Sequence, residues 1–349
     1  MPQREGLSLL VLAAVAVPLL NGCVTHGPSS GGSATTAPPR ITVLYDAFGR
    51  DAAMSKDWGY AALIEYRGKR ILFDTGNDPG ILEHNARAAG ADLSRLDFVV
   101  MSHRHGDHMG GMSYLLRVNP RVRIYAPKEN FGVYGFSLPG SFYRQDPSLP
   151  AEQRYYDGSP PAIMKFGSAW PQANLELIEN STEIAPGFHL VALVSDKPTT
   201  LELRELSLVI DTPDGEVVVV GCSHPGIERI AAAAAAINPR IQLLVGGLHL
   251  VAAKDADIEK TVAALHDTYQ VAYVAPGHCT GEPTFAALRK SFGERYLYAG
   301  VGTSIALGPA PHAIVAGNEA HEAGLSGQDL REYRALAANQ ELASAAELR

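Results

Sequence analysis

The apolar pattern of the first half of the chain predicts a hairpin, a helix and a buried strand in succession. Apolar runs at 61–66 and 70–73 flank a short glycine-containing turn, which is typical of a β-hairpin. Asp78 precedes a proline and predicts the N-cap of a helix that ends near Gly90. The apolar residues of 96–101 then predict a buried strand.

The second half repeats this order. We expect strands over 207–211, 216–220, 241–245 and 271–275, and helices over 225–237, 256–268 and 282–292. In both halves a buried strand is followed by a polar loop that contains histidine. The sequence therefore predicts one α/β (α+β) domain of two similar halves over residues 41–310.

The first 40 residues predict export. Residues 7–20 form an apolar run that is too short to span a bilayer and resembles a signal-peptide core. Leu20-Asn21-Gly22-Cys23 resembles a bacterial lipobox, with Cys23 as the lipid attachment point. We expect residues 1–22 to be a lipoprotein signal peptide and residues 23–40 a flexible tether. The predicted location is a membrane surface, on the periplasmic side or at the cell surface; the alternative is a plain secretory signal with an incidental cysteine.

Two further segments depart from the α/β pattern. Residues 131–170 hold nine aromatic residues together with prolines and glycines that disfavour a long helix. They are either a flap over a substrate site or an insertion that needs aromatic residues to pack itself. Residues 311–349 are rich in Ala and Glu and predict a polar tail with an exposed helix over 329–348.

Composition narrows the function classes. The chain is 46% hydrophobic and 19% charged, which excludes a long disordered protein. Its net charge of −8, from 29 Lys and Arg against 37 Asp and Glu, gives no electrostatic footprint for nucleic acid. We therefore expect a small-molecule substrate and no nucleic acid partner. The 12 histidines and 3 cysteines point instead to metal chemistry.

The strongest motif follows the buried strand at 96–101. It places His103, His105, Asp107 and His108 within six residues, and Gly110-Gly111 permits the tight backbone that such a loop needs. Imidazole and carboxylate ligands together suit zinc, iron or manganese, and the lack of a four-cysteine set disfavours a closed structural zinc site. The alternative is a solvated histidine-rich turn.

This motif resembles the His-x-His-x-Asp-His signature of the metallo-β-lactamase superfamily. Leu72-Phe73-Asp74-Thr75-Gly76 resembles the first motif of the same superfamily. The resemblance implies a four-layered αβ/βα sandwich with two divalent metal ions, most simply zinc, at the edge between the halves. It also implies that Asp74 holds the metal loop in place from behind the ligands.

Three later segments resemble one subgroup, the enzymes named 7,8-dihydropterin-6-methyl-4-(β-D-ribofuranosyl)-aminobenzene-5′-phosphate synthase and their relatives. These segments are Gly221–Ile227, Gly246–Leu250 and Gly277–Gly281. By position, the resemblance implies two ligand sets: His103, His105 and His224 for one metal, and Asp107, His108 and His278 for the other. A simpler interpretation of His224 is that it caps the following helix.

The chain also departs from the superfamily pattern. Residues 197–200 lack the usual second-half histidine, and Cys222 stands where a bridging aspartate is usual. Cys222 is either a thiolate ligand or, as we prefer, a small buried residue behind the ligands. Cys222 and Cys279 could instead form a disulfide in an exported domain.

Three other polar residues need an assignment. His249 is either a substrate contact with a catalytic role or a partner behind the ligands. Glu202 and Glu205 are interpreted as surface or hairpin charges.

Hydrolysis follows from such a site. Water held between two metals loses a proton near neutral pH, Asp107 orients it, and the metals polarise a carbonyl or phosphoryl oxygen. We expect an exported metal-dependent hydrolase of an ester, phosphoester or lactam. One alternative is a synthase-like transferase. Export disfavours it, because an exported enzyme lacks cytosolic phosphoribosyl donors. The other alternative is a redox scaffold without hydrolytic turnover.

Overall fold

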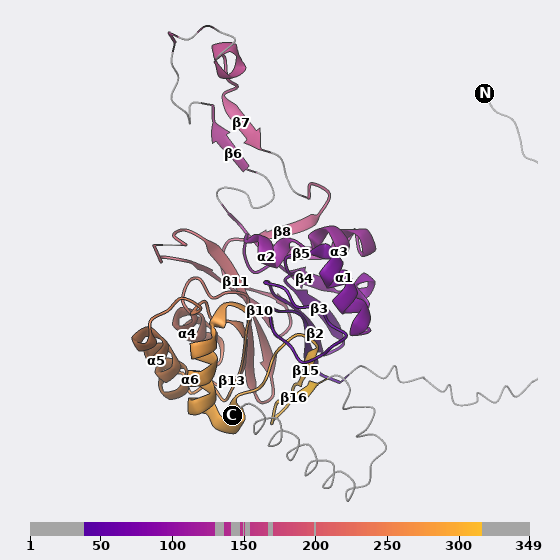
Figure 1. The fold of residues 1–349 in the computed structure, drawn as a ribbon, viewed down its shortest axis with the longest axis vertical. Coiled ribbons are helices and arrows are strands. Elements are labelled where there is room, and N and C mark those ends of the chain that lie inside the picture. The colour runs from indigo at the N-terminus through magenta and orange to yellow at the C-terminus, as the bar shows by residue number, and fades with distance from the viewer. Residues whose placement is uncertain are drawn as a thin grey trace, which may run out of the picture. The chain divides into compact units, whose positions relative to one another are not determined.

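Two β-sheets lie face to face in the computed structural model of the chain (Figure 1). The first sheet has the order β16 (His312–Val315), β15 (Thr303–Ala306), β1 (Arg40–Tyr45), β2 (Ala61–Tyr66), β3 (Lys69–Phe73), β4 (Phe98–Val100), β5 (Arg123–Pro127) and β8 (Asn174–Ile178). The second has the order β14 (Tyr273–Gly277), β13 (Ile241–Gly247), β12 (Gly215–Val220), β11 (Arg204–Thr212), β10 (Phe188–Val194) and β9 (Thr182–Ala185).

Helices cover the outer face of each sheet (Figure 1). The α-helices are α1 (Pro79–Ala88), α2 (Gly106–Met109), α3 (Met112–Val118), α4 (Ile227–Ile237), α5 (Asp255–Ala263) and α6 (Glu282–Phe292). Shorter helical turns are η1 (Leu93–Arg95), η3 (Tyr155–Gly158), η4 (Ala264–Thr268), η5 (His278–Thr280) and η6 (Gly293–Arg295).

The structure describes residues 38–129, 136–140, 147–148, 150, 154–166, 170–198 and 200–315. The predicted signal peptide, Cys23 and most of the tether lie outside these residues, as does the tail from residue 316. Within the described part, no helix is long and apolar enough to cross a bilayer.

The strands are apolar on both faces because each sheet lies between two hydrophobic layers. In β2, Ile64 packs into the core between the sheets, whereas Leu63 packs under the first helical layer. In β12, Val219 faces the central core and Val218 faces the second helical layer. This burial explains why the strands are continuous apolar runs rather than alternating ones. The predicted four-layered αβ/βα fold is confirmed.

Local signals in the sequence set the helix boundaries. Asp78 caps α1, accepting hydrogen bonds from the backbone N–H of Gly80 at 2.7 Å and of Ile81 at 2.9 Å. The predicted hairpin of β2 and β3 and the predicted helix α6 are also present. α4 begins at Ile227 with Gly226 at the N-cap, so the interpretation of His224 as a helix cap is wrong.

Two boundaries need comment. The sequence predicts that the domain ends at residue 310, but β16 lies beyond it. Because β16 pairs with β15 at the edge of the first sheet, it belongs to the domain. Within the aromatic stretch, the described residues form a two-stranded antiparallel ladder of β6 (Phe136–Pro139) and β7 (Ile163–Phe166). Much of the rest of that stretch lies outside the described residues, so whether it is a flap or an insertion that packs on itself stays open.

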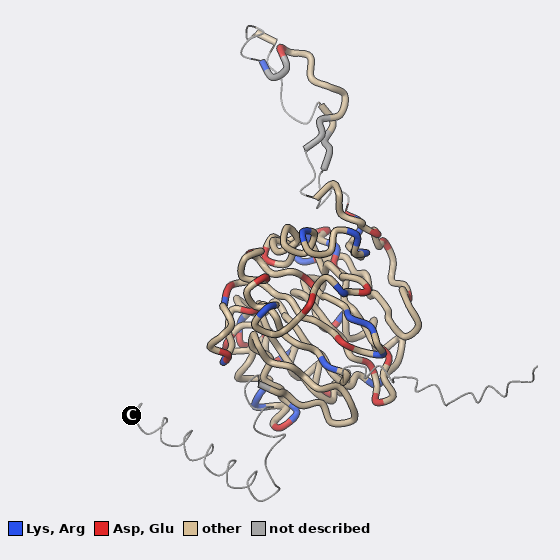
Figure 2. The backbone as a smooth tube through the Cα atoms, turned by 90° about the vertical axis from the view of Figure 1, so that its right-hand side faces the viewer, with Lys and Arg blue, Asp and Glu red and all other residues tan. Residues whose placement is uncertain are grey.

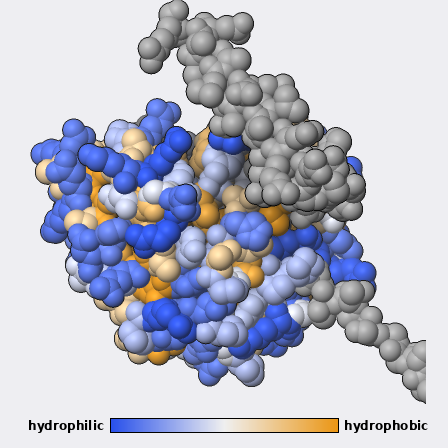
Figure 3. All heavy atoms as spheres, turned by 90° about the horizontal axis from the view of Figure 1, so that it is seen from below, coloured by the Kyte–Doolittle hydropathy of each residue, from blue (hydrophilic) through white to orange (hydrophobic). Residues whose placement is uncertain are grey.

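The surface carries charges of both signs, interspersed over the folded body (Figure 2). The face in Figure 3 is mostly hydrophilic, with small separate hydrophobic areas.

Strand direction places the histidine loops together. β3, β4 and β5 are parallel to one another, and β12, β13 and β14 are parallel in the second sheet. The loops with the predicted site residues follow β4, β12, β13 and β14 at their carboxyl ends. Loops at the carboxyl ends of parallel strands share one edge, which is where such folds bind ligands.

Candidate metal centre

Glycines permit close backbone approaches around these loops, one between the two halves and one within the second half. A Cβ atom on Gly221 would lie 2.2 Å from Oγ of Ser102. One on Gly246 would lie 1.9 Å from the carbonyl oxygen of Val220, and Gly246 has φ +119°. Only glycine fits either position, so the glycines of these motifs are required by the close approach of the backbones.

One predicted ligand set comes together at this edge. A ligand atom from each of His103, His105 and His224 lies within 4.8 Å of the other two. His103 and His224 are buried, and the Nε2 atom of each has no hydrogen-bond partner among the described residues. Buried ring nitrogens without a partner are costly. A divalent metal at this point would satisfy both.

The other predicted set forms a triangle of ligand atoms. Nε2 of His108 lies 3.1 Å from Nε2 of His278 and 3.8 Å from Oδ2 of Asp107, and the remaining side is 3.4 Å. Bonds of about 2.0–2.1 Å in a tetrahedral arrangement place ligand atoms about 3.3–3.4 Å apart. The three distances bracket that value, so the residues fit a divalent ion without rearrangement.

The two sets are adjacent. The rings of His103 and His108, one from each set, have centroids 4.2 Å apart. The site therefore holds five imidazoles and one carboxylate in two neighbouring groups, an arrangement that can accept two metal ions.

Asp74 orients the ligands of both sets. Its carboxylate lies 2.7 Å from Nδ1 of His108 and accepts hydrogen bonds from the backbone N–H and Oγ of Ser102, each at 2.7 Å. Oγ of Ser102 is in turn 2.8 Å from Nδ1 of His103. This network turns the Nε2 atoms of both rings toward the candidate metal positions.

Glu205 was misassigned from the sequence. It is buried, its Oε2 lies 2.9 Å from Nδ1 of His224, and its carboxylate accepts hydrogen bonds from the backbone N–H of Cys222, Ser223 and His224. Glu205 lies at the start of β11, which runs antiparallel to β12, so it reaches the loop that follows β12. The expectation of a surface or hairpin charge is wrong for Glu205, whereas Glu202 is exposed.

Sequence reasoning also missed Asp46. Its Oδ2 accepts a hydrogen bond of 2.9 Å from the backbone N–H of His278, which has a strained φ of +46°. Burial raises the pKa of Asp46 to about 8, against the opposing effect of its backbone hydrogen bonds. An acidic residue directly after the apolar run 41–45, as Asp74 follows β3, is the pattern that could have identified it.

Cys222 and Cys279, the cysteines of the described part of the chain, are free thiols and both are buried. Sγ of Cys222 lies 3.1 Å from Nε2 of His108, among the ligand atoms of both sets. Sγ of Cys279 accepts a hydrogen bond of 3.3 Å from the backbone N–H of His249. The structure therefore places Cys222 at the candidate centre and contains no disulfide between these two residues.

His249 lies at the exposed side of the site. Its ring centroid is 4.2 Å from that of His224, and its backbone has φ +52°. Unlike His224, its side chain is open to solvent. It can therefore reach a molecule bound at the centre.

The protonation states suit a cation. Burial and then the neighbouring imidazoles lower the pKa of His103 well below its usual value, and burial lowers that of His105 to about 4. Burial opposes ionisation of Asp107, but the hydrogen bond to His278 and the charge of His108 outweigh it and lower its pKa. His103 and His105 are therefore neutral imidazole donors, as a divalent metal requires. At His108, burial opposes protonation, but Asp74 outweighs it and raises the pKa to about 9, so a metal that binds there displaces a proton.

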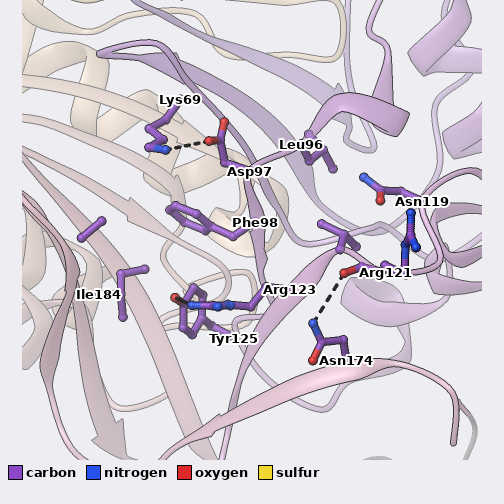
Figure 4. Close-up of a pocket in the computed structure, with 12 residues that line it drawn as sticks. Lys69, Leu96, Asp97, Phe98, Asn119, Arg121, Arg123, Tyr125, Asn174 and Ile184 are labelled. Carbon is purple, nitrogen blue, oxygen red and sulfur yellow. Dashed lines mark hydrogen bonds and ion pairs between the residues drawn. The ribbon is translucent and has the colours of Figure 1, made fainter. Parts of the chain in front are cut away.

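Among the cavities lined by described residues, two lie at opposite ends of the strands. A pocket of about 570 Å³ adjoins His278 and is lined by Trp58, Phe48 and Phe285. Another, of about 460 Å³, lies at the amino ends of β3, β4, β5 and β8, away from the histidine loops (Figure 4). Its Lys69 is already paired with Asp97 at 2.7 Å (Figure 4). The first cavity is thus the one that serves the candidate centre.

The chain is similar to known proteins in sequence and in fold. Residues 69–140 match a family described as a β-lactamase superfamily domain. A synthase of Methanocaldococcus jannaschii, 7,8-dihydropterin-6-methyl-4-(β-D-ribofuranosyl)-aminobenzene-5′-phosphate synthase, is 26% identical over 268 residues, which cover 69% of this chain and 86% of that protein. A hydroxyacylglutathione hydrolase of Aeromonas salmonicida is 35% identical over 71 residues, 20% of this chain and 26% of that protein.

Among solved structures, a metal-dependent hydrolase of the β-lactamase superfamily is 28% identical, with a TM-score of 0.57. The match covers 77% of this chain and 99% of that one. The resemblance predicted from the His-x-His-x-Asp-His motif is confirmed by these findings.

Proposed function

We propose that this chain, which has the metallo-β-lactamase fold, is a metal-dependent hydrolase of an ester, phosphoester or lactam. The observation that carries the proposal is the triangle of Nε2 of His108, Nε2 of His278 and Oδ2 of Asp107, with sides of 3.1, 3.4 and 3.8 Å. With the adjacent set of His103, His105 and His224, it offers places for two ions.

Divalent ions bound there would lower the pKa of a coordinated water and polarise a carbonyl or phosphoryl oxygen of the substrate. Zinc is the metal that best fits a set of imidazoles with one carboxylate and a thiol. Manganese and iron remain outcomes of the metal analysis.

The side chains divide the work. Solvent reaches the carboxylate of Asp107, whose side chain is 22% exposed, whereas the side chain of Asp74 is fully buried. Asp107 therefore orients the attacking water and accepts its proton, while Asp74 keeps His108 and Ser102 in place. His249, on the exposed side beside His224, contacts the leaving group or an anionic part of the substrate.

A synthase-like transferase is the second candidate. The 268-residue similarity to the Methanocaldococcus synthase favours it, since that alignment spans most of both chains. The same ligand sets would then activate a different nucleophile on a phosphorylated sugar donor. Product analysis with and without a pterin precursor separates the two reactions.

The test is a metal count coupled to a substrate panel of phosphodiesters, esters and lactams. We expect close to two metals per chain and turnover of one class. Asp107→Ala should lower kcat/KM at least 100-fold with the fold retained, whereas Asp257→Ala, an exposed aspartate of α5, should keep full activity. Fewer than one metal per chain, or full activity of Asp107→Ala, contradicts the proposal, and iron without turnover supports the redox scaffold.

Export and lipid attachment at Cys23 are a further part of the proposal, supported by the lipobox-like segment. In a bacterial host the chain should fractionate with membranes and carry acyl groups on an N-terminal Cys23. Cys23→Ala should release it from membranes. A Cys23→Ala chain that stays with membranes as the parent chain does would contradict the lipid anchor.

A further inference from the structure

The pocket beside His278 has aromatic walls. Its described lining comprises Ala47, Phe48, Trp58, Val251, His278, Gly281, Glu282, Pro283 and Phe285, which we call the Trp58 pocket. The rings of Phe48 and Phe285 have centroids 5.2 Å apart. The ring of Trp58 is 5.2 Å from that of His278, so the aromatic surface continues to a candidate metal ligand.

The side chain of Trp58 is unusually exposed for a tryptophan. Its side chain is 46% exposed, although tryptophan is highly buried on average. Val251, on the same pocket, is 49% exposed. Large apolar side chains left open to solvent at a concave site mark a surface that a ligand covers.

The pocket is held rigid before anything binds. The backbone N–H of Asp57 donates to the carbonyl of Asp46, and that of Tyr60 donates to the carbonyl of Asp107, each at 3.2 Å. Trp58 thus lies between two anchored positions of the loop that joins β1 and β2, and the second of them is bound to the metal loop at Asp107. On the other wall, the carbonyl of Phe48 accepts a 2.8 Å hydrogen bond from Val301. A fixed pocket loses little entropy when it binds a ring.

The charges of the pocket disfavour an anion on the side away from His278. Among its described lining residues the only carboxylate is that of Glu282, and none is Lys or Arg. The guanidinium of nearby Arg50 lies 4.6 Å over the ring of Tyr298 instead. A phosphate or carboxylate placed beside Glu282, away from the candidate metal position at His278, would meet that carboxylate with no Lys or Arg of the described lining to offset it.

We propose that the Trp58 pocket binds an uncharged aromatic ring of the substrate next to His278. This inference rests on the proposed hydrolase function and narrows its substrate to a molecule with a neutral aryl group beside the reacting ester, phosphoester or lactam. Flat rings match aromatic walls because ring pairs gain energy beyond the apolar area they bury. The volume of about 570 Å³ accommodates a fused bicyclic ring system.

The experiment compares three probes of one size by calorimetric titration of the metal-loaded full chain. They are 2-naphthamide, the saturated decahydronaphthalene-2-carboxamide and the anionic naphthalene-2-sulfonate. We expect 2-naphthamide to bind at least about tenfold more tightly than either of the others. Trp58→Ala and, as a second variant, Phe285→Ala should each remove that preference. Leu177→Ala, which truncates a 51% exposed side chain on β8, is the matched control and should retain it.

Equal binding of the saturated probe, tighter binding of the sulfonate, or an unchanged preference in both pocket variants would overturn the inference. Failure of the proposed function gives a different result. In that case the metal count and the substrate panel are negative, while binding of 2-naphthamide to the full chain as isolated, and its loss in the two variants, can still be measured.

Discussion

Nε2 of His108 and Nε2 of His278 lie 3.1 Å apart, although 170 positions separate the two residues in the chain. Nδ1 of His108 already faces Asp74, so its Nε2 presents a lone pair toward His278 when the ring is neutral. A shared cation would bind these two ring nitrogens and the carboxylate of Asp107 at this spacing, so that none of the three is left without a partner.

Metal removal should therefore destabilise the protein. Metal at about 100 times its Kd adds about 2.7 kcal/mol to the folded state, or roughly 5–10 °C in Tm for a domain of this size. Differential scanning calorimetry of metal-loaded and chelator-treated protein measures the difference. His278→Ala should respond less to the chelator, and an equal response from this variant would contradict the assignment.

Glu205→Gln should weaken one metal position only. The amide cannot accept as strongly from Nδ1 of His224 and from the three backbone N–H groups that the carboxylate now holds. We expect the affinity of the ion at His103, His105 and His224 to fall about 10–100-fold, with the other ion retained. Glu202→Gln, on the exposed hairpin, is the control. Loss of both ions together would argue against two separate ligand sets.

Cys222→Ser tests whether the thiol is a ligand or a buried neighbour. Because Sγ lies 3.1 Å from Nε2 of His108, we expect cobalt-substituted protein to show a sulfur-to-cobalt charge-transfer band that Cys222→Ser lacks. Cys279→Ser should keep the band. A spectrum of Cys222→Ser identical to that of the parent would assign Cys222 as a small buried residue.

Gly246→Ala should cost more stability than its backbone angle alone explains. The new Cβ would lie 1.9 Å from the carbonyl oxygen of Val220, in addition to the strain of φ +119°. Gly68 has φ +73°, but nothing lies within 4 Å of the Cβ that Gly68→Ala would add. This variant therefore measures the backbone strain without a steric clash. In urea denaturation we expect the free energy of unfolding to fall by about 1 kcal/mol for Gly68→Ala and by at least about 3 kcal/mol for Gly246→Ala. Equal losses would contradict the close approach of the two strands.

Glu216 should make the fold less stable at alkaline pH. It is buried opposite Asp211 in the β11–β12 ladder, and burial followed by the charge of Asp211 raises its pKa to about 7, while His189 opposes the shift. Since the folded pKa is above the unfolded value, its contribution is fully present below about pH 4.5 and is lost as the pH rises through 7.

Glu216→Gln keeps the neutral form at every pH. Relative to this variant, the parent should lose about 1–3 kcal/mol of unfolding free energy between pH 5 and pH 8. Urea denaturation at both pH values measures the difference. A constant gap between parent and variant would show that Glu216 is ionised throughout.

The elements of the fold could be predicted because their causes are local. Asp78 with the following proline fixes the start of α1, and the apolar runs that became β4, β12 and β13 are buried on both faces. The motif from His103 to His108 is equally local, since six consecutive residues carry four potential ligands.

Tertiary structure alone decided which distant residues complete the site. Glu205 and Asp46 look like ordinary acids beside a strand, and only the parallel alignment of β1, β3 and β4 and the antiparallel entry of β11 bring them to the ligands. Trp58 looks like one aromatic residue in a loop until Gly59 and Tyr60 anchor it against Asp107. Local patterns record the conformation of neighbours in the chain, whereas the contacts of a buried carboxylate depend on how sheets align, and no short stretch of sequence encodes that alignment.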